Sequence, residues 1–119
     1  MSARILFLLI GLGVAACASG PYVPAAAPDL SNATVIDRLR KVFAETKLPG
    51  TMQVSRPRAA HLVSPGDWLI CMRSSDRRQS LVYAIYFKGN DYVTSRLSVV
   101  IDRCEQEIYA GFGDPPKPN

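Results

Sequence analysis

The apolar and polar positions between residues 30 and 112 predict one helix followed by several β-strands. A stripe of apolar residues recurs at three- and four-residue spacing, which is the pattern of one helix face. The stripe consists of Val35, Ile36, Leu39, Val42 and Phe43. Ser31 or Asn32 can accept backbone hydrogen bonds as the N-cap, and Pro49 ends the helix because proline cannot continue it. We expect this stripe to pack on the protein's own sheet rather than on a partner.

After Gly50 the apolar period changes to two, which predicts strands. The expected strands are 51–55, 68–73, 81–88 and 92–101. Pro57 follows the first of them and confines that region to an edge or a loop. The residues Gly89-Asn90-Asp91 predict a tight hairpin between the last two strands, and Ser64-Pro65-Gly66-Asp67 fits a type II turn.

The burial pattern differs between the last two expected strands. Strand 81–88 is apolar on both faces, which is typical of a central strand that is covered twice. In strand 92–101 one face is apolar and the other is mainly polar, which predicts a half-buried strand. Its apolar face carries Val93, Leu97, Val99 and Ile101. The expected fold is an α+β domain with one N-terminal helix packed on a three- to four-stranded antiparallel sheet.

The first 16 residues have the pattern of a secretory leader. Arg4 is the only charged side chain before Asp29, and the 12 residues from Ile5 to Ala16 are almost entirely apolar. As a helix this stretch spans roughly 18 Å, which is short of the roughly 30 Å hydrocarbon core of a bilayer. A signal peptide over residues 1–16 is therefore expected rather than a permanent membrane span.

The leader ends in Val14-Ala15-Ala16-Cys17, which resembles the lipobox of bacterial lipoproteins. The resemblance implies that Cys17 receives a diacylglycerol thioether and becomes the N-acylated first residue, anchored to a membrane by covalent lipid such as palmitate. Ala18, in place of an aspartate, implies sorting to the outer membrane, on its periplasmic side. The alternative is an ordinary signal peptide cleaved near Ala16 or Ala18.

Segments rich in proline flank the expected domain of residues 30–112. Residues 17–29 hold the lipidated cysteine and a Pro/Ala-rich tether, and residues 113–119 form a proline-rich tail that we expect to be disordered. Extended in polyproline geometry, 12 tether residues reach nearly 40 Å, or about 3.1 Å each. The domain is therefore expected to stand off the membrane.

Composition and net charge narrow the range of possible binding partners. A chain of 119 residues with 48% hydrophobic and 20% charged residues is typical of one globular domain. The formal net charge of +4 falls to about +3 when Arg4 is removed with the leader. So mild a charge suits anionic lipid head groups or glycans and does not require nucleic acid. We expect an envelope protein or an anionic glycolipid as partner, and no nucleic acid.

Cys71 and Cys104 are the two cysteines that lipidation leaves over, and in an exported chain such a pair is expected to form a disulfide. Two free buried thiols are the alternative. The bond closes a loop of about 33 residues and is worth about 3–4 kcal/mol. A straight three-strand meander would carry Cys104 roughly 23 Å away along the strand direction. Either the chain turns after Ile101 and crosses back, or the strand order is not a meander, or the thiols are free. We expect the crossing, with residues 105–112 covering the second apolar face.

No catalytic signature was found. His61 is the only imidazole and is expected in a loop, and three cysteines with one histidine cannot form a zinc site of two cysteines and two histidines, or of four cysteines. We therefore expect no catalytic residue, metal or cofactor. Asp102, Glu105 and Glu107 are expected to be solvated surface residues.

Arg73, Arg77 and Arg78 cluster at one expected hairpin end, and Arg103 could approach the same end. Guanidinium groups bind phosphate through paired hydrogen bonds, so this cluster is a candidate anion-binding site. The alternative is a solvated rim of the hairpin.

Together these features predict a non-enzymatic, lipid-anchored protein of the cell envelope that binds another envelope component or has a structural role. The expected architecture is similar to that of small bacterial lipoproteins with a helix or two on an antiparallel sheet, such as the accessory lipoprotein of the outer-membrane β-barrel assembly machine. The alternative is a small periplasmic hydrolase, or an inhibitor of one.

Overall fold

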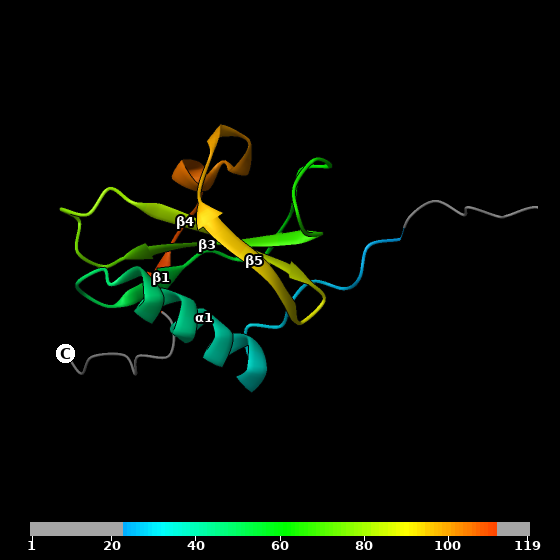
Figure 1. Cartoon of the computed structure of the whole chain (residues 1–119), viewed down its shortest axis with the longest axis horizontal. Helices are drawn as coiled ribbons and strands as arrows, with labels where there is room; N and C mark the ends of the chain where they lie inside the picture. Colours follow the sequence, from blue (N-terminus) through cyan, green and yellow to red (C-terminus); the bar gives the residue numbers. More distant parts are fainter. Residues whose placement is uncertain (1–22, 112–119) are drawn as a thin grey trace, which may run out of the picture.

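The structure is a computed structural model that describes residues 23–111, in which one helix packs on a six-stranded antiparallel sheet (Figure 1). The elements are α1 (Ala33–Thr46), β1 (Met52–Val54), β2 (Arg58–Ala59), β3 (Trp68–Ser74), β4 (Val82–Lys88), β5 (Asp91–Leu97), the 3-10 helices η1 (Val100–Asp102) and η2 (Cys104–Gln106), and β6 (Ala110–Gly111). The α+β class is confirmed. The predicted signal peptide, Cys17 and the tail 113–119 lie outside the described residues.

The number of strands exceeds the three to four that were predicted. The sheet order is β5-β4-β3-β1-β6, and β2 pairs with β3 beyond the end of β1. The two extra strands, β2 and β6, have two residues each. β2 resumes the pairing with β3 after Pro57, and β6 forms only after the chain has crossed the sheet, so neither leaves an alternating pattern in the sequence.

Helix α1 begins and ends close to the predicted signals. Asn32, rather than Ser31, is the N-cap, and its side chain accepts hydrogen bonds from the backbone N–H groups of Thr34 and Val35 at 2.9 and 3.3 Å. The helix stops at Thr46, earlier than Pro49 requires, because Lys47 adopts a left-handed conformation with φ 56°. The apolar stripe faces the sheet, as predicted: Val35, Leu39 and Val42 are 0–4% exposed.

The sheet has a core on each face. Ile85 and Phe87 of β4 point toward α1, and Ala84 and Tyr86 point to the other face. All four side chains are fully buried, so the predicted twofold cover of this strand is confirmed. Figure 1 shows α1 on one side of the sheet and the segment that follows β5 on the other.

Strand β5 departs from its prediction in length and burial. It ends at Leu97 instead of Ile101, because the chain turns into η1. The apolar face that was expected to be buried is partly open, with Val93 and Leu97 42% and 50% exposed. The physical reason is position: β5 is an edge strand, and one helix does not cover the full width of the sheet.

The expected crossing after the last long strand is present. Residues 98–109 pass over the second face of the sheet and deliver the chain to β6, which pairs with β1. Tyr109 packs against the core of that face, whereas Ile108 points away and is 87% exposed. We call residues 98–111 the crossing segment.

Gly66 serves close packing rather than a type II turn. A type II turn needs a positive φ at its third position, and among the described glycines only Gly50 and Gly89 have one. A Cβ on Gly66 would lie 2.9 Å from the Cβ of Tyr86 and 3.2 Å from the carbonyl oxygen of Phe87. The predicted turn type was therefore wrong, and the glycine is required by its neighbours on β4.

The end of the predicted tether is attached to the domain. The indole N–H of Trp68 donates to the carbonyl oxygen of Ala25 at 2.7 Å, and the backbone N–H of Asp29 donates to Asn90 Oδ1 at 2.8 Å. Pro28 between them is buried. Residues 25–29 of the predicted tether are thus part of the folded domain. Among the described residues, no helix is long and apolar enough to cross a membrane.

Candidate functional site

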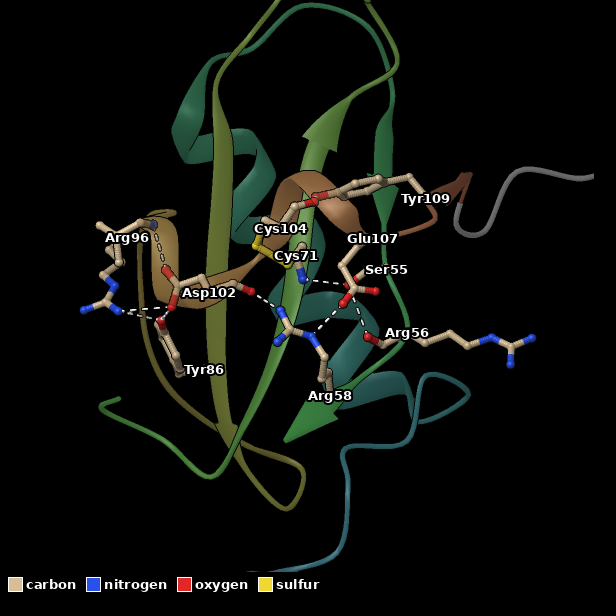
Figure 2. The surroundings of a disulfide bond; sticks show 11 residues. Ser55, Arg56, Arg58, Cys71, Tyr86, Arg96, Asp102, Cys104, Glu107 and Tyr109 are labelled. Carbon is tan, nitrogen blue, oxygen red and sulfur yellow. Dashed lines mark hydrogen bonds and ion pairs between the residues drawn. A yellow bond between two sulfur atoms is a disulfide. The ribbon is translucent and has the colours of Figure 1, made fainter. Parts of the chain in front are cut away.

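The second face of the sheet is organised around the disulfide between Cys71 and Cys104 (Figure 2). Cys71 lies in the middle of β3, Cys104 lies in η2, and their Cα atoms are 5.5 Å apart. Both residues are fully buried. Ser55 also contacts β3 at Cys71, because its hydroxyl accepts a hydrogen bond from the backbone N–H of Cys71 at 2.9 Å. The disulfide therefore fixes the crossing segment to the centre of the sheet.

A buried carboxylate holds the start of the crossing segment. Asp102 is fully buried and accepts hydrogen bonds from the Tyr86 hydroxyl, from Arg96 at 3.2 Å and from the backbone N–H of Val99 at 2.9 Å. Arg96 also donates to the Tyr86 hydroxyl at 2.8 Å. We call Tyr86, Arg96 and Asp102 the Asp102 cluster.

Electrostatics keep Asp102 ionised. Burial by itself raises the pKa of Asp102, but the hydrogen bonds from Tyr86, Val99 and Arg96 outweigh it and hold the pKa below its ordinary value. The pKa of Tyr86 is raised, first by burial and then by its hydrogen bond to the carboxylate. At neutral pH the negative charge of Asp102 is therefore compensated by the positive charge of Arg96. Both carboxylate oxygens accept hydrogen bonds from groups of the domain itself.

The rest of the crossing segment is held by side chains from β2 and β3. Arg58 forms an ion pair with Glu107, with 2.6 Å between Nε and Oε1, and also donates to the carbonyl oxygen of Asp102. The Arg73 guanidinium lies 4.1 Å from the centre of the Tyr109 ring, in cation–π geometry. Burial is the main cause that raises the pKa of Tyr109 to about 12. These contacts order the chain as far as β6.

A cleft lies between the crossing segment and β1. Its volume is about 660 Å³. It is lined by residues from three segments that are distant in sequence: Leu30; Val54, Ser55 and Arg56; and Gln106, Glu107, Ile108 and Ala110. Ile108 stands 87% exposed, Arg56 is also exposed, and the Glu107 carboxylate is paired with Arg58. The cleft is thus largely apolar, with charged groups in its lining.

The predicted arginine cluster is divided among separate partners. Arg73 lies over Tyr109 and donates to Gln53 at 2.9 Å, and Arg78 forms an ion pair of 3.0 Å with Asp76. Arg77 is exposed. Anion binding by this loop stays a prediction.

Arg103 does not lie beside that loop in the structure. It lines a hollow with Arg58, at the β2 side of the sheet. His61 is exposed in the loop after β2, as expected, and its Nδ1 accepts the backbone N–H of Val63 at 3.3 Å.

Asp102 and Glu107 lie in surroundings that differ from their prediction. Both were expected to be solvated surface residues, yet Asp102 is fully buried and Glu107 is half-buried in an ion pair. The physical reason is that the crossing segment lies over a sheet face whose Tyr86 and Arg58 supply the donors. The only available signal was that Asp102 directly follows the apolar run 99–101.

Residues 23–111 contain no group of three or more histidine, cysteine, aspartate or glutamate side chains that could hold a metal ion. No protein-family model, curated protein or solved structure matches the chain. Function is therefore inferred from the chain's own residues.

Proposed function

We propose that the protein is a lipid-anchored component of the cell envelope, on the periplasmic side of the outer membrane, whose domain is a non-enzymatic binding module. The anchor is supported by the lipobox-like residues Val14-Ala15-Ala16-Cys17 after an apolar leader. The disulfide of Cys71 with Cys104 supports export, because disulfides persist in oxidising compartments such as the periplasm.

The cleft beside the crossing segment is the observation that carries the binding role. Concave sites with apolar walls and a few polar groups are the usual form of a binding site. Here Leu30 and Val54 supply apolar wall, and Ile108 at 87% exposure adds apolar surface that has no cover among the described residues. We propose that an apolar segment of another envelope protein occupies this cleft.

The contacts that surround the cleft favour a site that exists before its partner arrives. The wall formed by residues 106–110 is held by the disulfide at Cys104, by the Arg58–Glu107 ion pair and by the hydrogen bond of 2.7 Å from the Tyr109 hydroxyl to the Cys104 carbonyl. A wall already ordered loses little conformational entropy on binding, which favours affinity.

The proposal is tested by site-specific photocrosslinking in native envelopes. A photoreactive amino acid is placed at Gln106, which lines the cleft and is exposed, and in a control at Glu45, which is exposed on α1 away from the cleft. We expect a discrete adduct from position 106 and none from position 45. Adding Ile108→Asp to the position 106 protein should remove the adduct. Equal adducts at both positions, or an adduct insensitive to Ile108→Asp, would refute a binding role for the cleft.

A further inference from the structure

The loop after β2 and the segment that leads to Cys17 meet at one end of the domain. Pro24 lines a hollow of about 580 Å³ together with residues of the loop 59–67 and Lys88 at the end of β4. The contacts of Ala25 with Trp68 and of Asp29 with Asn90 hold the incoming chain at the same end. In Figure 1 the blue-to-cyan chain, the yellow β4–β5 hairpin and the green loop all lie at this end of the sheet.

The same end displays apolar side chains that the fold leaves in solvent. Leu62 is 100% exposed and Val63 is 75% exposed at the tip of the loop, and Val23 in the incoming chain is 80% exposed. Of these two neighbouring side chains at the loop tip, Leu62 is fully exposed and Val63 keeps three-quarters of its surface in solvent, so neither contributes to the core of the described domain. Their exposure therefore points to a contact with something outside the domain.

The loop tip is held by backbone hydrogen bonds, so the backbone that carries its apolar side chains is ordered. Ala60 donates to the Asp67 carbonyl at 2.9 Å, which closes the base of the loop, and Ser64 donates to the His61 carbonyl at 2.8 Å, which closes its tip. Asp67 in turn donates its backbone N–H to Phe87 at 3.1 Å. Leu62 and Val63 are the two central residues of the turn that the Ser64–His61 bond closes.

Chain length places this end near the proposed anchor. Eight peptide steps separate Cys17 from Ala25 in the sequence, and eight residues span at most about 29 Å when fully extended. An acylated Cys17 would therefore keep the end that carries Leu62 and Val63 within reach of the bilayer surface, with Ala25 no more than about 29 Å from the anchor.

The charges at this end do not favour one lipid charge. Lys88 is exposed close to the loop, but Asp91, its partner across the hairpin, and Asp29 are exposed as well. Because charges of both signs lie at this end, they offset each other and give no strong attraction to anionic head groups. Apolar insertion into the interfacial layer of the bilayer fits the exposed groups better.

We propose that Leu62 and Val63 insert into the bilayer interface and that the anchored domain sits on the membrane with this end down. The inference rests on the proposed lipid anchor, and it adds a second, reversible contact to it. The occupant of this surface is lipid, and a second copy of the chain or another protein is the competing outcome of the test.

The first test measures depth in the membrane. The mature chain, starting at residue 17, is coupled through the Cys17 thiol to a maleimide phospholipid in phosphatidylcholine vesicles, so that the anchor is present whether or not cells acylate it. An environment-sensitive fluorescent amino acid replaces Leu62 or, as control, Glu45, which is exposed on α1. We expect quenchers on the lipid chains to reach the probe at 62 and only aqueous iodide to reach the probe at 45. Aqueous access at both positions overturns the proposal.

The second test removes the anchor. The mature chain with Cys17→Ser should partition weakly onto phosphatidylcholine vesicles, and Leu62→Asp with Val63→Asp should lower the partition coefficient by roughly tenfold or more, because two apolar side chains are lost. Gln79→Asp with Ser80→Asp adds acidic groups at two exposed neighbours in the loop at the other end of β3, and should leave the partition coefficient unchanged. An equal loss for both variants overturns the proposal. Protection of position 62 that needs no vesicles and rises with protein concentration assigns the surface to a second copy, which also overturns it.

Failure of the anchor and failure of insertion give different results. If Cys17 carries no lipid in cells but the coupled chain inserts position 62, the anchor proposal alone is wrong. If Cys17 is acylated in cells but position 62 stays in water, the insertion proposal alone is wrong.

Discussion

Replacing Asp102 removes the centre of the buried cluster on the second face of the sheet. In Asp102→Ala the Tyr86 hydroxyl and the Val99 backbone N–H lose their acceptor, and Arg96 loses its counter-charge. Asp102→Asn keeps the size of the side chain and one oxygen acceptor but removes the charge. The pair of variants therefore separates the loss of packing and hydrogen bonds from the loss of ionisation.

The expected loss for Asp102→Ala is about 3 kcal/mol in the free energy of unfolding. Removing one partner of a buried ion pair costs about 3–5 kcal/mol, and the lower end applies because the Arg96 side chain is 38% exposed, so water screens its share. Asp102→Asn should cost about 1–2 kcal/mol, the value of one or two hydrogen bonds. For a domain of this size, about 3 kcal/mol lowers the melting temperature by about 12–24 °C.

The dependence on pH supplies a second signature. Because the folded pKa of Asp102 lies below its ordinary value, the carboxylate stabilises the fold above about pH 4, and this contribution is lost as the pH falls through the folded pKa. The stability gap between wild type and Asp102→Asn should therefore narrow below pH 4. Asp29 and Asp76 also have lowered pKa values, from hydrogen bonds with Ser31 and Arg78, but both are present in each protein and cancel in the difference.

Urea unfolding of the mature chain, followed by circular dichroism at pH 7 and below pH 4, measures both effects. An Asp102→Ala protein within about 0.5 kcal/mol of wild type at pH 7, the range of ordinary surface changes, would show that the cluster does not hold the crossing segment. A gap between wild type and Asp102→Asn that stays constant across the pH range would show that ionisation of Asp102 does not contribute.

Three further changes test other parts of the fold in the same unfolding assay. Leu39→Ala, at a fully buried position of α1, should cost about 2–5 kcal/mol, and a cost below about 0.5 kcal/mol would mark the stripe as exposed. Cys71→Ser with Cys104→Ser should cost about 3–4 kcal/mol for the 33-residue loop, and peptide mapping that finds both thiols free in wild-type protein isolated without reductant would contradict the bond. Gly66→Ala should cost about 1–3 kcal/mol because its Cβ meets that of Tyr86 at 2.9 Å, and unchanged stability would show that β4 yields at this point.

Local patterns predicted the elements that carry their own signals. The stripe of α1 marks its buried face, and the two-faced apolar pattern of β4 indicates its central place. Distance arithmetic on Cys71 and Cys104 predicted the return of the chain over the sheet, because a disulfide cannot span a straight meander.

The candidate site could not be predicted because it joins segments with no local signal. Asp102 has the sequence surroundings of a surface residue, and its burial depends on Tyr86, which lies 16 positions earlier in the chain. The cleft brings together Leu30, Val54 and Ile108, which become neighbours only through the crossing. The burial of β5 was misjudged because an alternating pattern does not reveal how far one helix extends over the sheet.

The central claim is that Cys17 carries the lipid anchor. Mass spectrometry of the N-terminal peptide, in protein purified from native membranes, tests this claim most directly. If the protein is lipid-anchored, we expect a mature chain that begins at Cys17 and carries a diacylglyceryl group, with or without an N-acyl chain. The Cys17→Ser variant should not incorporate labelled palmitate. A mature chain that begins at Cys17 or Ala18 with no lipid mass, or equal palmitate labelling of wild type and Cys17→Ser, would contradict it.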